Sequence, residues 1–218
     1  MQTGKKRVMI VDDHPLFRER LAQLINHEPD MQVCGEAEDA EKAIQVIRDV
    51  FPDLVIIDIT LKGSSGLELV KTIKALSIGV PMLVLSMHDE SLYAQRALRA
   101  GATGYITKHR AADDVLSAMR RVLSGEVYLS ERMTSQVLKS FASAGSKGGS
   151  RPIDRLTDRE LEVLTLIGNG STTRQIAHAL NLGLATVDTY RTRIKEKLNF
   201  SSATELQHFA VRWVRERE

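Results

Sequence analysis

Three aspartates of this 218-residue chain follow short apolar runs, at points where strands are expected to end. Asp12 and Asp13 come directly after VMIV, and Asp58 follows LVII. Where such ends converge, three carboxylates a few ångströms apart cannot all stay ionised without a cation, because like charges raise one another's pKa. Their oxygen ligands suit a hard divalent ion, and Mg²⁺ fits a carboxylate cage that water and phosphate complete. Each aspartate taken singly could instead be a helix cap or a turn residue.

Two more polar side chains fall at predicted strand ends. Ser86 closes the run MLVLS, and Lys108 follows the run GYIT. In phosphoryl transfer a hydroxyl donates a hydrogen bond to a phosphate oxygen, and an ammonium offsets the incoming charge. Asp58 would then be a carboxylate nucleophile that forms an acyl phosphate. The structural alternative for Ser86 is a cap at the end of its strand.

The segments that must position these residues alternate between two hydrophobic periods. Short, almost uniformly apolar runs predict five strands: Val8–Val11, Met31–Ala37, Leu54–Ile57, Met82–Leu85 and Gly104–Thr107. Apolar residues at spacings of three and four predict five helices between and after them: Leu16–Asn26, Ala40–Val50, Leu67–Leu76, Leu92–Ala100 and Ala112–Leu123. This alternation implies right-handed crossovers and a doubly wound parallel sheet covered on both faces. Such a sheet places its ligand sites beyond the carboxyl ends of its strands.

The composition changes at Ser143–Ser150, where eight small or polar residues predict a flexible linker. The alternative is a surface loop within one domain. After Ser150 the apolar residues keep only the helical period. This period predicts four short helices: Asp158–Ile167, Thr173–Leu180, Ala185–Leu198 and Ala203–Val214. Thr157 and Glu160 have the spacing of a capping box at the start of the first of them.

Composition limits the class of protein. Hydrophobic residues make up 43% of the chain, enough for a buried core, and no apolar run reaches the ~18 residues that a membrane span needs. The start, MQTGKKRVMIVDD, lacks the long apolar stretch of a signal peptide. The single cysteine, Cys34, excludes internal disulfides and cysteine-based zinc sites. We therefore expect a cytoplasmic protein that does not bind a membrane.

The predicted helix Ala185–Leu198 combines positive charge with a narrow apolar stripe. Its cations are Arg191, Arg193, Lys195 and Lys197, and its apolar stripe is Val187, Ile194 and Leu198. Gly183 fits a sharp turn from the helix before it. A short helix of this kind suits the major groove of DNA. The alternative is a solvated helix face that binds nothing.

Several segments of the first part resemble the receiver domain of two-component response regulators, from about Arg7 to Leu123: VMIVDDHPLF, PDLVIIDITLKGSSGLEL, MLVLS and AGATGYITK. The resemblance implies that Asp58 accepts a phosphoryl group and that Mg²⁺ binds beside it. The implied metal ligands are Asp12, Asp13, Asp58 and the backbone carbonyl of Thr60. Leu61-Lys62 departs from the family's usual Met-Pro pair and places a cation near the rim of the pocket.

The same resemblance implies a switch. Ser86 and Tyr105 would be the switch pair, and Lys108 would contact the phosphate. After phosphorylation the pair is expected to shift inward and to alter the face formed by the fourth helix, the fifth strand and the fifth helix. Tyr105 could instead be a plain core residue.

The stretch LTDRELEVLTLIGNGSTTRQIAHALNLGLATVDTYRTRIKEKL resembles the LuxR-type helix-turn-helix of the NarL/FixJ regulators. The residues expected to meet DNA are Thr172, Thr173, Thr186, Asp188, Thr189, Tyr190, Arg191, Arg193, Lys195 and Lys197. Asp188 stands where many relatives carry lysine, and we expect its carboxylate to accept a hydrogen bond from a base amine or a neighbouring arginine. The last predicted helix has an apolar stripe that packs on its own domain or, as the resemblance implies, contributes to a dimer: Leu206, Phe209, Ala210 and Trp213.

The sequence thus predicts an α/β receiver domain of (βα)5 topology in residues 1–125, a linker with a helix in 126–151, and a small all-α, four-helix, LuxR-type helix-turn-helix domain in 152–218. The expected function is that of a response regulator and not of an enzyme. A sensor histidine kinase would phosphorylate Asp58 with Mg²⁺ as cofactor, and the active homodimer would bind double-stranded promoter DNA. A phosphatase of the haloacid-dehalogenase type is one alternative, although Thr60 stands where that class has its second acid. The other is a phosphate-independent dimerisation or ligand-sensing platform.

Overall fold

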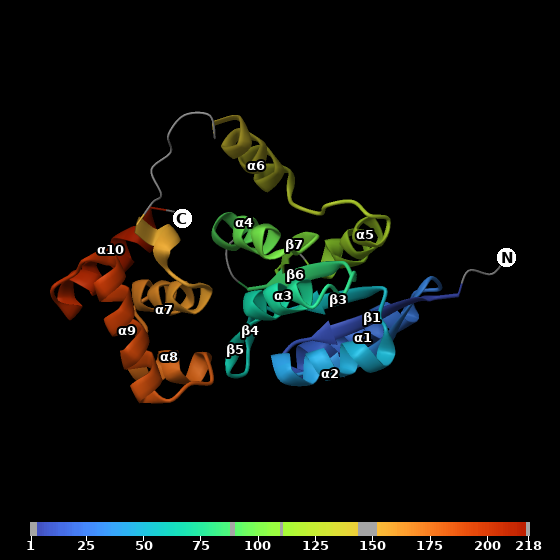
Figure 1. Ribbon diagram of the computed structural model, residues 1–218, viewed down its shortest axis with the longest axis horizontal. Helices are drawn as coiled ribbons and strands as arrows, with labels where there is room; N and C mark the ends of the chain where they lie inside the picture. Colours follow the sequence, from blue (N-terminus) through green and yellow to red (C-terminus); the bar gives the residue numbers. More distant parts are fainter. Residues whose placement is uncertain (1–3, 88–89, 110, 144–151, 217–218) are drawn as a thin grey trace. The chain divides into compact units, whose positions relative to one another are not determined.

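The computed structural model describes residues 4–87, 90–109, 111–143 and 152–216, and it divides the chain into two compact units, 1–145 and 146–218 (Figure 1). A parallel five-stranded sheet forms the centre of the first unit, in the order β2-β1-β3-β6-β7. Its strands are β1 (Lys6–Val11), β2 (Met31–Ala37), β3 (Leu54–Ile57), β6 (Met82–Ser86) and β7 (Gly104–Thr107). Because β1 pairs with both β2 and β3, the chain reverses its direction of winding there, and the predicted doubly wound sheet is confirmed.

Helices cover both faces of this sheet. They are α1 (Pro15–His27), α2 (Ala40–Val50), α3 (Gly66–Ala75), α4 (Glu90–Ala100) and α5 (Ala111–Leu123). Strand residues such as Val8 and Ile56 form one buried cluster with Leu21 of α1 and Val115 of α5. Alternate strand residues, such as Met9, are fully buried as well, and α2 and α4 contact strands of the sheet. Burial on both faces explains why the central strands β3 and β6 are almost uniformly apolar.

Three further elements lie outside the predicted strands and helices. A short antiparallel hairpin, β4 (Thr60–Leu61) and β5 (Ser64–Ser65), follows Asp58 directly. Helix α6 (Glu131–Ser143) lies where a helix was expected between the domains without stated bounds, and the 3-10 turn η1 (Pro152–Arg155) precedes the second unit's helices. The predicted Ser143–Ser150 linker lies outside the described residues, apart from Ser143.

The second unit consists of helices, as predicted: α7 (Asp158–Gly168), α8 (Thr173–Ala179), α9 (Leu184–Leu198) and α10 (Ala203–Arg215). The predicted capping box is present, since Glu160 and Thr157 each bond the backbone N–H of the other. Gly168 lets α7 and α10 approach closely, because a Cβ there would lie 2.6 Å from the carbonyl oxygen of Ala210. Within the described ranges, none of the helices is both long and apolar enough to cross a lipid bilayer.

Candidate functional site

The carboxyl ends of β1 and β3 bring the three predicted aspartates together. Val11 pairs with Ile57 in the parallel ladder, and the backbone N–H of Asp58 donates to the carbonyl oxygen of Val11 at 2.9 Å. Asp12, Asp13 and Asp58 therefore meet at one edge of the sheet, with side chains 3%, 7% and 3% exposed. The convergence that the sequence analysis required is present.

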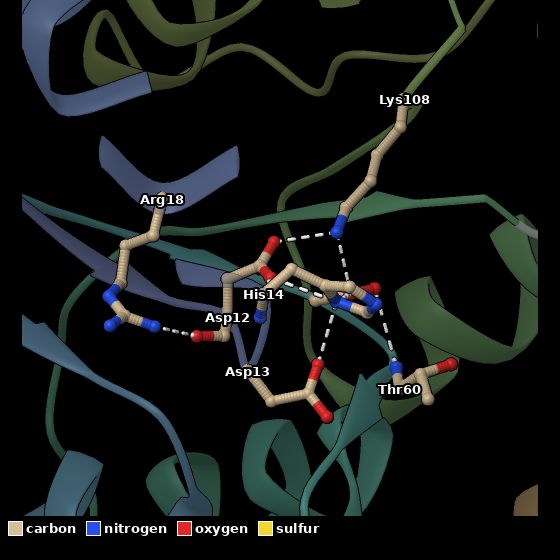
Figure 2. A network of polar contacts seen from close by, with 7 residues as sticks. Asp12, Asp13, His14, Arg18, Thr60 and Lys108 are labelled. Atoms are coloured by element: carbon tan, nitrogen blue, oxygen red, sulfur yellow. Dashed lines mark hydrogen bonds and ion pairs between the residues drawn. The ribbon is translucent and has the colours of Figure 1, made fainter. Parts of the chain in front are cut away.

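Lys108 supplies the cation of this site from the end of β7 (Figure 2). Its Nζ lies 2.6 Å from Asp12 Oδ2 and 2.7 Å from Asp58 Oδ2, and 4.3 Å from the centre of the Phe17 ring. Its backbone N–H donates to the carbonyl oxygen of Ser86 at 2.7 Å, which ties the ends of β6 and β7 together. Burial disfavours the charged ammonium, but the carboxylates of Asp58 and Asp12 outweigh it, so the pKa of Lys108 lies above its ordinary value.

Asp58 is held as a buried carboxylate. Burial raises its pKa from 3.8 to about 6, the charge of Lys108 opposes this rise, and the charge of Asp12 adds to it. At neutral pH the group is still ionised, which is the form that a nucleophile requires. The backbone N–H of Thr60 donates to Asp58 Oδ1 at 3.3 Å. Gly66 lies directly against the backbone of Asp58, because a Cβ at that position would lie 1.8 Å from the carbonyl oxygen of Asp58.

The same groups fit a divalent metal ion. Ligand atoms of Asp12, Asp13, His14 and Asp58 all lie within 4.8 Å of one another. Three carboxylates against the single ammonium of Lys108 leave two negative charges, which one divalent cation would neutralise. Carboxylate oxygens are hard ligands, and Mg²⁺ is a hard cation that prefers them. The donor set therefore fits the predicted Mg²⁺.

His14 and Arg18 also belong to this network, and the sequence analysis did not single them out (Figure 2). His14 Nδ1 lies 2.8 Å from Asp13 Oδ1 and 3.3 Å from Asp12 Oδ1, and its side chain is 63% exposed. Arg18 donates from Nη1 to the carbonyl oxygen of Asp12 at 2.6 Å and from Nε to Glu36 at 3.0 Å. The position of His14 beside Asp13 in the sequence was an available signal. The Arg18 contact depends on how α1 lies over β2, which the sequence pattern does not give.

Ser86 and Tyr105 lie on neighbouring strands, β6 and β7, and both are fully buried. Ser86 is the last residue of β6, close to the backbone of Lys108. Tyr105 lies in the middle of β7, the strand that contacts α4. The role of the two residues as a switch pair stays a prediction.

The predicted DNA-contacting residues lie on α9 and at the start of α8, where Thr172 is the N-cap. The apolar stripe of α9 is buried as predicted, through Val187, Ile194 and Leu198. The exposed members of the predicted set are Thr172, Thr186, Asp188, Thr189 and Arg193, and the half-buried members are Thr173, Tyr190, Arg191, Lys195 and Lys197. This division leaves one polar face of α9 open to a ligand.

Internal contacts hold two of these side chains. Arg191 Nη1 donates to Thr173 Oγ1 at 3.3 Å, which joins α9 to the first residue of α8. Lys197 Nζ donates to Glu160 Oε2 at 2.6 Å. Burial opposes ionisation of Glu160, but the hydrogen bonds from Lys197 and Thr157 lower its pKa. These contacts fix the orientation of α9 within its unit, and contact of either cation with DNA stays a prediction.

In metal-free buffer, we expect the Asp58 carboxyl to make the chain less stable as the pH rises. Its pKa of about 6 in the folded chain exceeds the ordinary 3.8, so the stabilising contribution is present at low pH and is lost as the pH rises through about 6. Between about pH 5 and about pH 7.5 this loss amounts to about 1 kcal/mol. Denaturant unfolding of the native chain and of Asp58→Asn at both pH values measures this loss, as the pH-dependent difference between their free energies of unfolding. A difference between the two chains that does not depend on pH would contradict the account.

Two family models match the chain, one within each compact unit. The family model described as "Response regulator receiver domain" matches residues 8–120, and "Bacterial regulatory proteins, luxR family" matches residues 154–210. The chain is 37% identical over 204 residues to the transcriptional activator protein ExaE of Pseudomonas putida, covering 94% of this chain and 95% of that protein. It is 33% identical over 207 residues to the response regulator GacA of Pseudomonas aeruginosa, with coverage of 94% and 95%. A solved structure of RcsB from Salmonella enterica serovar Typhimurium, bound to promoter P1flhDC in the presence of phosphomimetic BeF3-, matches with a TM-score of 0.61 and 25% identity, over 95% of this chain and 98% of that one.

Proposed function

The chain belongs to the NarL/FixJ family of two-component response regulators, and we propose that it accepts a phosphoryl group on Asp58 and thereby controls its own binding to promoter DNA. The observation that carries this proposal is the Lys108 ammonium between Asp12 and Asp58, at the carboxyl edge of the sheet. It joins a nucleophile, its counter-charge and the acidic ligands in one buried place. The proposed parts are a receiver in 1–125, a connection in 126–151 and a DNA-binding domain in 152–218.

The phosphoryl donor is a phosphohistidine of a partner sensor histidine kinase. A carboxylate oxygen of Asp58 attacks the phosphorus, a P–O bond forms as the P–N bond breaks, and the imidazole of the kinase leaves with the electron pair. Lys108 stays protonated and donates to the new phosphoryl group, which replaces a carboxylate oxygen as its partner. The Ser86 hydroxyl donates to another phosphoryl oxygen. As Ser86 shifts toward that oxygen, Tyr105 on the neighbouring strand shifts inward with it.

Asp12, Asp13, Asp58 and the backbone carbonyl of Thr60 would hold Mg²⁺ in this site. When bound, the ion offsets the negative charge of the transferring phosphoryl group. Thr60 has no carboxyl group to act as a general acid in repeated hydrolysis, which argues against a phosphatase of the haloacid-dehalogenase type. The site therefore suits one stoichiometric transfer that acts as a signal.

The output of this signal is DNA binding in the cytoplasm. We propose that α9 lies in the major groove and that the chain binds as a homodimer on a two-fold site. The promoter-bound RcsB structure supports promoter binding by its similarity to the present chain. Leu206, Ala210 and Trp213 are buried within their own unit, so a dimer through α10 would use the opposite side of that helix.

Arg193→Ala is expected to weaken promoter binding by more than about 1 kcal/mol, the lower end for a good base contact. Arg193 is exposed and forms no ion pair or side-chain hydrogen bond with the part of the chain that the structure describes, so the change removes no folding contact. Fluorescence anisotropy with a promoter duplex at fixed salt measures the effect, because salt alone changes such affinities strongly.

One control variant and one further α9 variant accompany Arg193→Ala. Arg20→Ala removes an exposed arginine from α1 and should leave DNA affinity unchanged. Asp188→Ala removes an exposed carboxylate from α9, which should strengthen non-specific binding by relieving repulsion from phosphate and should reduce discrimination between base pairs. Undiminished binding by Arg193→Ala would mean that α9 meets DNA with another face, or that it does not meet DNA.

The proposed function is tested by treating the purified chain with a small-molecule phosphodonor in the presence of Mg²⁺. Mass spectrometry locates the phosphoryl group, and promoter affinity is measured before and after treatment. We expect modification at Asp58 together with tighter binding. Modification at Asp58 without a change in affinity would place control of transcription outside this switch.

A further inference from the structure

Within the first unit, the segment that follows α5 is held by two contacts, one with β7 and one with α4. After α5, Tyr128 lies beside the free edge of β7, where its backbone N–H donates to the carbonyl oxygen of Thr103 at 3.1 Å and its carbonyl oxygen accepts from the N–H of Tyr105 at 2.9 Å. Gly104 permits this approach, because a Cβ there would lie 3.1 Å from both the Cβ and the carbonyl oxygen of Tyr128. The guanidinium of Arg121 in α5 lies 5.4 Å from the centre of the Tyr128 ring.

The second contact consists of two hydrogen bonds from Ser130 to Glu90. The Ser130 hydroxyl donates to Glu90 Oε2 at 2.6 Å, and its backbone N–H donates to Glu90 Oε1 at 3.0 Å. The same hydroxyl accepts from the N–H of Met133 at 3.1 Å, and the Ser130 carbonyl accepts from the N–H of Thr134 at 2.8 Å. Ser130 is therefore the N-cap of α6, and Glu90 holds that cap from 40 positions away.

Both contacts involve residues on or just after β6 and β7, the two strands that end at the phosphoryl site. Tyr128 is bonded to the backbone of Tyr105, three residues before Lys108 in the same run of chain. Glu90 is the first residue of α4 and stands four positions after Ser86. Tyr128 and Ser130 are therefore hydrogen-bonded to residues that stand close in the sequence to Lys108 and Ser86 at the phosphoryl site.

We propose that Glu90 and Ser130 are positioning residues that couple the state of Asp58 to the first turn of α6, and hence to the chain that continues toward the DNA-binding unit. This inference rests on the proposed function. It adds the contact through which phosphorylation of the receiver would change the first turn of α6. Glu90 and Ser130 are accessible to solvent, because they line a groove of about 500 Å³ together with Asp114, Ser117, Arg121 and Tyr128.

The test compares Ser130→Ala and Glu90→Gln with conservative and matched variants in the full chain. Glu90→Gln leaves one acceptor for the two donors of Ser130, whereas Ser130→Thr keeps the hydroxyl and the cap. Glu131→Gln is the matched control, since it removes an exposed carboxylate next to Ser130 that forms no ion pair or hydrogen bond within the described residues. Each variant is treated with phosphodonor and Mg²⁺, and both the phosphorylated fraction at Asp58 and the promoter affinity are measured.

We expect Ser130→Ala and Glu90→Gln to be phosphorylated as the native chain is, while the ratio of promoter affinities with and without phosphodonor falls about fivefold or more, or to unity if the native ratio is smaller than that. Ser130→Thr and Glu131→Gln should keep the native ratio. The double variant should be no worse than either single variant, because the two residues act through one contact.

A merely structural role would change stability, or affinity in both states equally, and leave the ratio unchanged, which would overturn the proposal. Loss of phosphorylation in Glu90→Gln would overturn it as well, because the contact would then act before transfer and not after it. A native chain that shows no response to the phosphodonor would instead refute the proposed function. The two failures are therefore distinguishable.

Discussion

Asp58→Asn is expected to abolish phosphorylation and, with it, the gain in promoter affinity that a phosphodonor produces. The amide that replaces the carboxylate is not a nucleophile toward phosphorus, while its size and its hydrogen bond from Thr60 are retained. Intact-mass measurement after phosphodonor treatment should show no added phosphoryl group at residue 58. Promoter affinity should be the same before and after treatment.

The control for this variant is Asp49→Asn, which removes an exposed carboxylate from α2 and should respond as the native chain does. If Asp58→Asn kept the full response of DNA binding, Asp58 would not be the acceptor. If the native chain and Asp58→Asn bound DNA identically under all conditions, the phosphate-independent platform would be the better account of the receiver.

Lys108→Ala is expected to have two large effects. Its side chain is 5% exposed and its ammonium bridges Asp12 and Asp58, so its removal leaves two buried carboxylates without their cation. Breaking a buried pair in this way costs about 3 kcal/mol of unfolding free energy in metal-free buffer at neutral pH. Millimolar Mg²⁺ should recover part of that loss, because the ion replaces the missing positive charge.

The second effect concerns signalling. We expect Lys108→Ala to accept some phosphoryl group on Asp58 but to lose the accompanying change in DNA affinity, because the side chain that links the phosphoryl group to β7 is absent. Urea unfolding with and without Mg²⁺ measures the first effect, and phosphodonor-dependent anisotropy measures the second. Lys62→Ala is the control, since Lys62 is exposed in the turn between β4 and β5. A Lys108→Ala chain with a normal response would remove Lys108 from the switch.

Much of this architecture could be predicted because it depends on local patterns. The ranges Met31–Ala37, Leu54–Ile57 and Gly104–Thr107 agree with the observed strands residue for residue. Leu54–Ile57 is the clearest case, because a fully buried strand is a short apolar run. Asp12, Asp13, Asp58 and Lys108 could be grouped because one topological rule brings strand ends to a common edge.

The remaining features depend on contacts between distant residues or on elements too short to have a period. The hairpin β4–β5 has two-residue strands, and no hydrophobic alternation can be recognised over that length. The bond between Glu90 and Ser130 joins residues 40 apart and requires the placement of α4 beside the connecting chain. The full burial of Tyr105 depends on how the core packs around β7, which the identity of the residue does not specify.

The most direct test of the central claim is the promoter affinity of the native chain, measured with Mg²⁺ before and after phosphodonor treatment on samples whose modified residue is identified by mass spectrometry. The account predicts one phosphoryl group, on Asp58, and tighter binding in the modified sample. Absence of any phosphoryl group on Asp58, or a modified sample with unchanged affinity, would contradict the claim that the buried Asp58–Lys108 pair controls DNA binding.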